Sequence, residues 1–170
     1  NTTGLQNNAF GDIALGGNST GSYNVAVGEQ SLYNSNADDN TGCGHRTLQA
    51  NTTGSKNTAI GANAADANTT GSNNTAGNYN VAVGQGALES NTTSSYSVAI
   101  GVGALQQNTA SNITAVGRNA LNANTTGTQN TAVGYQALDA NTTGQQNNAF
   151  GDNALGGNST GSYNVAVGEQ

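Results

Sequence analysis

One short phrase recurs along the whole chain. The stretch 130–140 reads NTAVGYQALDA, and NVAVGEQSL, NTAIGANAA, NVAVGQGAL, SVAIGVGAL and ITAVGRNAL repeat it with small changes. Of the nine intervals between successive glycines of this phrase, eight are 16 or 17 residues and one is 23. A period this short predicts a solenoid, in which each unit packs only on its neighbours. These repeat glycines, expected to be structural turn residues, are Gly11, Gly28, Gly44, Gly61, Gly84, Gly101, Gly117, Gly134, Gly151 and Gly168.

A longer repeat period is superimposed on the short one. Residues 1–30 and 141–170 are identical at 28 of 30 positions, so the larger unit spans 140 residues and eight repeats. We expect one repeat array of about ten coils over residues 1–170, forming a fragment of a longer chain. The long interval falls near residues 72–80, which contain no Val, Ile or Leu. We expect this insert to bulge outward as a loop or an incomplete coil.

Each repeat has the residue pattern of extended chain and turns. The run Thr/Val-Ala-Val/Ile is strand-like, the glycine after it allows a bend, and Asn-Thr-Thr-Gly is turn chemistry. We expect the Ala-Leu pair to begin a second short strand. A helix is disfavoured, because the Gly- and Asn-bearing repeat has no sustained apolar face with a 3.6-residue period. The sequence therefore predicts an all-β protein, a parallel β-solenoid of coils of about 17 residues.

Stacking of the coils aligns equivalent residues in columns, which are numbered here from the repeat glycine. We expect the large apolar residues at positions −1 and +4 to form the core. The small residues at position −2 point to the other face of the strand, where we expect them to contact partner chains. A thin core of this kind also predicts an oligomer. The position −2 alanines are Ala9, Ala26, Ala59, Ala82, Ala99, Ala115, Ala132, Ala149 and Ala166.

The charge content limits the possible partners. Only 7% of residues are charged, and three basic residues cannot form the cationic surface that a phosphate backbone requires, so we expect no nucleic-acid binding. No apolar run approaches the roughly 20 residues of a membrane span, so we expect no membrane contact within this segment. The single cysteine, Cys43, excludes an intrachain disulfide and a cysteine-based metal site, and its place in the position −1 column predicts a small buried hydrophobe.

Side chains for catalysis are sparse. His45 is the only histidine, and the nine carboxylates occur mostly at variable positions that we expect to face solvent. No calcium-binding repeat and no phosphate-binding loop occurs. We expect no enzyme activity, no catalytic residue, no cofactor and no metal. A polysaccharide lyase on a right-handed β-helix is the enzyme alternative, and it would require acidic or basic residues clustered on one face.

Asn-x-Ser/Thr sequences number ten, and eight of them share one turn position. Two interpretations stay open for that column. The asparagines and threonines can form ladders that close the coil, or the asparagines can carry sugar in a secreted fibre. The eight possible glycosylation sites are Asn1, Asn18, Asn51, Asn68, Asn91, Asn124, Asn141 and Asn158.

The phrases NVAVGEQSL, NTAIGANAA and SVAIGVGAL resemble the NSVAIG-x-x-S repeat of YadA-like heads in trimeric autotransporter adhesins. NTAVGYQAL followed by NTTG is similar to repeats of phage and large-virus tail fibres. The resemblance covers nearly the whole chain, although the family's coils are typically shorter. It implies a trimer of left-handed parallel β-rolls with an adhesive function.

Together these observations predict a structural and adhesive extracellular fibre module, either an adhesin head or a tail-fibre shaft. Its place would be a cell surface, an extracellular filament or a virion. Its partners would be further copies of the chain, as a trimer or a fibre, and a surface receptor or glycan. The alternative is a glycosylated, homopolymeric extracellular filament with a scaffolding role.

Overall fold

The fold is a stack of coils in which each coil contributes one short strand. In the computed structural model, residues 3–69 and 80–169 are described, and they contain a single parallel sheet and no helix. The ten strands pair in chain order. The predicted β-solenoid with coils of about 17 residues is confirmed. The strands are β1 (Asn8–Phe10), β2 (Val25–Val27), β3 (Thr41–Cys43), β4 (Thr58–Ile60), β5 (Val81–Val83), β6 (Val98–Ile100), β7 (Thr114–Val116), β8 (Thr131–Val133), β9 (Asn148–Phe150) and β10 (Val165–Val167).

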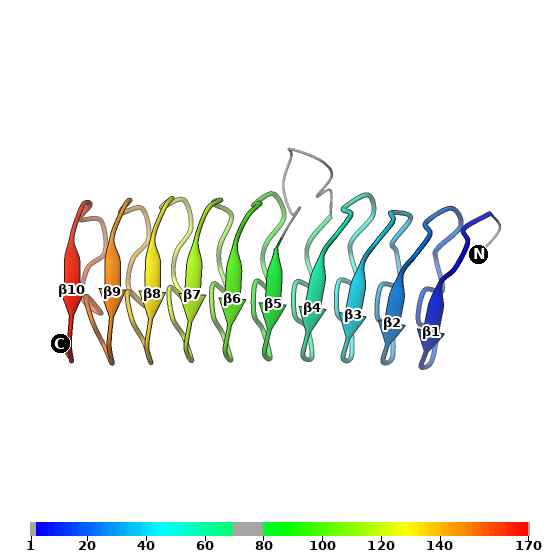
Figure 1. The fold of residues 1–170 in the computed structure, drawn as a ribbon, viewed down its shortest axis with the longest axis horizontal. Coiled ribbons are helices and arrows are strands. Elements are labelled where there is room, and N and C mark those ends of the chain that lie inside the picture. Colours follow the sequence, from blue (N-terminus) through cyan, green and yellow to red (C-terminus); the bar gives the residue numbers. More distant parts are fainter. Residues whose placement is uncertain (1–2, 70–79, 170) are drawn as a thin grey trace.

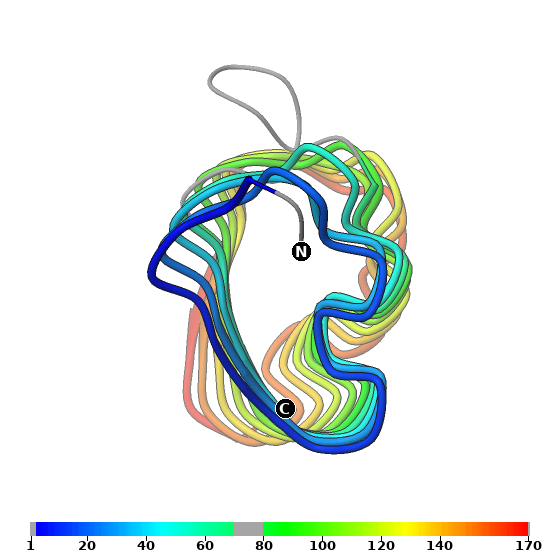
Figure 2. The same ribbon diagram turned by 90° about the vertical axis from the view of Figure 1, so that its right-hand side faces the viewer.

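The coils advance along one straight axis (Figure 1). Each strand runs downward on the near side, the chain returns upward behind it, and the coils progress from β1 at the right to β10 at the left. Seen along the axis, the chain winds counterclockwise as it recedes from the viewer (Figure 2). The solenoid is therefore left-handed. Below, coil n is the coil that contains strand βn.

The strand register is the same in every coil. The position −2 residue of each strand pairs with the position −2 residue of the next, as in Ala132↔Ala149. This register continues across the long interval, where Ile60 pairs with Val83. The predicted outward loop near residues 72–80 falls almost wholly outside the described residues. The ladder on its two sides is in register, so the extra residues do not shift the strands.

The predicted second strand is wrong, because the Ala-Leu segment is a series of tight turns. Leu138 has φ 53° and Gln136 has φ 53°, both in the left-handed region that bulky residues rarely adopt. The Leu138 N–H donates to the carbonyl of Ala154 in the next coil at 3.0 Å. The Gln136 N–H donates to the carbonyl of Arg118 in the preceding coil at 2.9 Å. Hydrogen bonds to both neighbouring coils and the burial of Leu138 offset the cost of this backbone.

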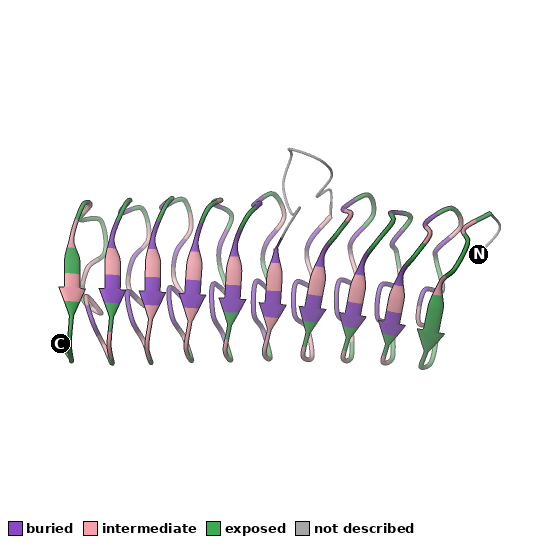
Figure 3. Cartoon of the chain, in the orientation of Figure 1, coloured by how far each residue is buried: buried purple, intermediate pink, exposed green. Residues whose placement is uncertain are grey.

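Alanine and leucine fill the core. The prediction for position +4 is confirmed, since the leucines of coils 2, 3 and 5 to 8 are fully buried. The predictions for positions −2 and −1 are both wrong. The strand alanines from Ala26 to Ala149 are buried and therefore face the interior of the coil, whereas the larger residues beside them are at least partly exposed (Figure 3). The coil is narrow, and leucine from the facing turn occupies the space next to the strand, so only a methyl group fits there.

The outward residues of the strands form a continuous surface, here called the outer strand face. It consists of positions −3 and −1 of the ten strands, and none of these twenty residues is charged. Ile60 is 42% exposed and Ile100 is 40% exposed, in the middle of the stack. Cys43 also lies on this face and is exposed, so its expected burial is wrong. The solenoid thus presents a long, uncharged and largely apolar strip of sheet to its surroundings.

Candidate functional site

The repeat glycines stand where the strand bends into the turn. Their φ values lie between 122° and 143°, a region that L side chains rarely adopt. A Cβ atom on Gly61 would lie 2.7 Å from the carbonyl carbon of Gly84 in the next coil, and the glycines from Gly11 to Gly151 have the same kind of contact. Glycine is thus required at this turn for two reasons, the backbone angle and the close approach of the next coil.

The asparagines of the predicted glycosylation column form a buried ladder. Asn141 donates from Nδ2 to Oδ1 of Asn124 in the preceding coil at 2.9 Å, and to the carbonyl of Gly144 at 3.1 Å. Asn158 continues the ladder by donating to Asn141 at 3.4 Å. This supports the structural interpretation of the column. Six of its members are at most 2% exposed: Asn18, Asn51, Asn68, Asn91, Asn124 and Asn141.

Glycosylation would have to compete with this ladder. N-linked sugar is attached through Nδ2, which is the atom that Asn124 and Asn141 use for the ladder. A sugar there requires the coil to open. Asn158 is half-buried, and Asn1 lies outside the described residues.

A second asparagine ladder, which was not predicted from the sequence, runs through position −4. Oδ1 of Asn24 accepts from the backbone N–H of Asn40 in the next coil at 2.9 Å, and Asn40 donates from Nδ2 to the carbonyl of Gly54 at 2.7 Å. The same arrangement joins Asn130 to Asn147. The signal was present in the sequence, because nearly every copy of the phrase begins with Asn. The asparagine side chain supplies hydrogen-bond partners for backbone N–H and carbonyl groups of the turn that have none in the sheet.

The described residues contain no group of three or more His, Cys, Asp or Glu side chains that could hold a metal ion. One carboxylate has a distinct environment. Asp66 forms a salt bridge to Arg46 at 3.4 Å, and its other oxygen is buried without a hydrogen-bond partner among the described residues. Burial raises the pKa of Asp66, while Arg46 lowers it, Glu89 raises it and His45 lowers it. His45 is exposed. No described helix is long and apolar enough to span a membrane.

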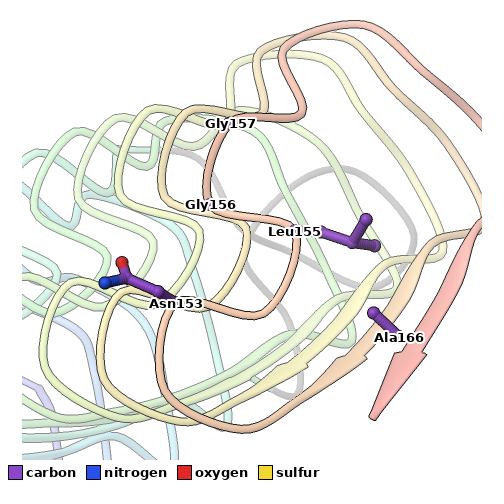
Figure 4. Close-up of a pocket in the computed structure, with 5 residues that line it drawn as sticks. All are labelled: Asn153, Leu155, Gly156, Gly157 and Ala166. Atoms are coloured by element: carbon purple, nitrogen blue, oxygen red, sulfur yellow. The ribbon is translucent and has the colours of Figure 1, made fainter. Parts of the chain in front are cut away.

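An apolar hollow of 370 Å³ lies in coils 9 and 10. Leu155 and Ala166 point toward one another across it, and Asn153, Gly156 and Gly157 follow the turn beside it (Figure 4). These are the same columns that close the core in the inner coils, where leucine and alanine are fully buried. The hollow is therefore the uncovered end of the hydrophobic core at coils 9 and 10.

A second hollow of 290 Å³ is polar and lies on the turn side of the solenoid, over coils 4 to 7. We call it the polar hollow. Positions +1, +2 and +5 of successive coils form its walls, and five of its eight lining residues carry an amide or carboxylate side chain. Its lining residues are Asn63, Gln85, Gly86, Glu89, Val102, Gly103, Gln106 and Asn119.

Comparisons with known proteins found no matching family model, no similar curated protein and no similar solved structure. The resemblance to YadA-like heads and viral fibres therefore stays a prediction that rests on the repeat phrases.

Proposed function

We propose that this chain is a structural and adhesive module of an extracellular fibre, in which copies of the solenoid associate side by side through the outer strand face. The observation that carries the proposal is that this face is partly or fully exposed, uncharged and largely apolar along the ten strands. Extended apolar patches on a protein surface mark interaction sites. The resemblance sets the number of associated copies at three.

A second copy of the chain is the partner that fits this face best. The side chains of the face repeat at the spacing of the strands, about 4.8 Å, and another copy has the same spacing. The ten strands form a strip about 43 Å long and about 10 Å wide, so pairing covers roughly 400 Å² on each copy. This is about half of the roughly 800 Å² per partner in a stable interface. Each further coil adds area, so the association strengthens with the length of the array.

Stiffness is the second property that suits a fibre. Backbone hydrogen bonds join each coil to its neighbours in the strands and also in the turns, as in Leu121 to Ala137 and Thr125 to Thr142. The coils therefore cannot bend independently of each other. The alternative, a glycosylated filament with a purely scaffolding role, receives less support, because most of its expected sugar sites are buried in the asparagine ladder.

Analytical ultracentrifugation tests the association. We expect the sedimentation coefficient to rise with protein concentration, and the double substitution Val83→Lys with Val116→Lys to leave a folded monomer. The double substitution Thr126→Lys with Thr143→Lys is the matched control, because it adds the same two charges on exposed Asn-Thr-Thr-Gly turns, away from the strands. A compact monomer at every concentration would contradict the proposal, and so would association that the two face lysines leave unchanged.

A further inference from the structure

The polar hollow exists because two successive coils have glycine at position +2. These are Gly86 and Gly103, with φ 68° and 69°. In seven other coils the same position carries a side chain, and its φ is also positive, as in Asn63 and Asn119 with 57° and 58°. The backbone therefore does not require glycine at this position. What the two glycines change is the space above the turn.

The missing side chains uncover a set of polar groups. A Cβ atom on Gly86 would lie 3.4 Å from Nε2 of Gln106 and 3.4 Å from Oε2 of Glu89. A Cβ atom on Gly103 would lie 2.5 Å from Oδ1 of Asn119. Any longer side chain at these positions would occupy the volume in front of these groups. The hollow is thus open toward amides and one carboxylate.

Several of these groups are held in place by the neighbouring coils. Gln106 donates from Nε2 to Glu89 at 2.5 Å, and its Oε1 accepts from Nδ2 of Asn122 at 3.1 Å. Oδ1 of Asn63 is buried and has no hydrogen-bond partner among the described residues. A buried acceptor of this kind is satisfied when a ligand donates to it. Val102, which is 50% exposed, adds an apolar patch to the wall.

We propose that the polar hollow binds a single neutral sugar ring, an inference that rests on the adhesive part of the proposed function. Sugar hydroxyls donate and accept hydrogen bonds, and the amides of Asn63, Gln85, Gln106 and Asn119 also do both. The C–H face of the ring can pack on Val102. A volume of 290 Å³ is at the small end of ligand pockets, which suits one ring.

The charges of the lining exclude two other ligand classes. Glu89 is the only charged residue among those that line the hollow, so an anionic ligand meets repulsion and no counter-charge. A divalent cation favours several carboxylate oxygens, and the described residues hold no cluster of three or more acidic, His or Cys side chains. Neutral hydroxyl-bearing ligands remain as the class that the lining accommodates.

The test is an NMR titration of the isotope-labelled chain with glucose, galactose, mannose and N-acetylglucosamine, each alone. We expect at least one of them to shift the backbone signals of Gly86 and Gly103 and the side-chain NH₂ signals around the hollow. Half-saturation should fall on the order of 1 mM, as ligand efficiencies give for about a dozen non-hydrogen atoms. Gly86→Gln should weaken binding at least tenfold, because the side chain fills the hollow in a backbone that Gln136 already adopts.

Gln136→Asn is the matched control, because it changes the same register position outside the hollow and should leave the titration unchanged. Three results would overturn the inference: no shift with any of the four sugars, equal binding by Gly86→Gln, or the same shifts produced by calcium chloride alone. Sedimentation of Gly86→Gln is measured in parallel. Normal association of this variant together with lost sugar binding separates this site from the outer strand face.

Discussion

The side chains of Asn124 and Asn141, both fully buried, are joined by a hydrogen bond of 2.9 Å between neighbouring coils. A carboxamide carries a donor and an acceptor, so identical asparagines can stack one above the other with each satisfying the next. The interior of this solenoid is therefore partly polar. Its stability depends on these ladders as well as on the alanine and leucine columns.

Replacement of Asn141 by Ala should lower the free energy of unfolding by about 1–3 kcal/mol, because Oδ1 of Asn124 and the carbonyl of Gly144 lose a donor inside the coil. Urea unfolding measures the change. Thr143→Ala is the matched control. It also changes the Asn-Thr-Thr sequence that begins at Asn141, but the altered residue is exposed and the asparagine ladder stays intact. Equal losses in the two variants would mean that the ladder is not what stabilises this turn.

Gly134→Ala should prevent stable folding, because the new methyl group would overlap the carbonyl of Gly151 and the backbone has φ 143°. Gly157→Ala should be nearly neutral, since nothing lies within 4 Å of a Cβ atom there. Circular dichroism and thermal unfolding compare the two. A well-folded Gly134→Ala protein would refute the close approach of the coils at the repeat glycines.

The inward and outward columns should respond differently to substitution. Leu138→Ala should cost about 2–5 kcal/mol through the cavity that it leaves. Ala132→Val should cost about 1–3 kcal/mol through overpacking of the narrow coil. Val133→Thr, on the outer strand face, should change stability by no more than about 0.5 kcal/mol. Chemical denaturation ranks the three, and a larger loss for Val133→Thr than for Leu138→Ala would reverse the assignment of the faces.

Asp66 should make stability depend on pH in an unusual direction. Burial raises the pKa of Asp66, so the folded state keeps this proton to higher pH than the unfolded state does. Its contribution therefore becomes less favourable as the pH rises from 3.8 through the raised pKa. Asp66→Asn should gain stability over the wild type across that window. Thermal unfolding between about pH 3 and about pH 7 measures the difference.

Asp139→Asn is the control for that experiment, because Asp139 occupies the same position in its coil as Asp66 does. Neither neighbouring coil, 7 or 9, has an acidic residue at that position. The expected result is a difference between Asp66→Asn and wild type that grows with pH. A difference that shrinks as the pH rises would show that the salt bridge to Arg46, and not burial, dominates at Asp66.

The candidate sites were only partly predictable. The repeat glycines and the asparagine column were visible as fixed positions in the repeat, but the sequence left the role of the asparagines open between ladder and glycosylation. The polar hollow was not predicted at all. Its signal was the glycine at position +2 in VGQGAL and VGVGAL. In the sequence this glycine is typical of any turn. The structure shows that other coils carry a side chain at the same position with a similar φ, so the backbone does not explain the two glycines.

The sequence by itself determined the coil length, the position of the strand within each coil, the turn at the repeat glycine and the inward direction of the leucines, because each of these depends on residues that recur at one spacing. Only the tertiary structure decided which face of the strand points inward. Strand alternation allows either face, and hydrophobicity alone favours valine over alanine as the buried residue. In the folded coil, leucine from the opposite turn takes the space beside the strand, so Ala132 lies inside and Val133 lies outside.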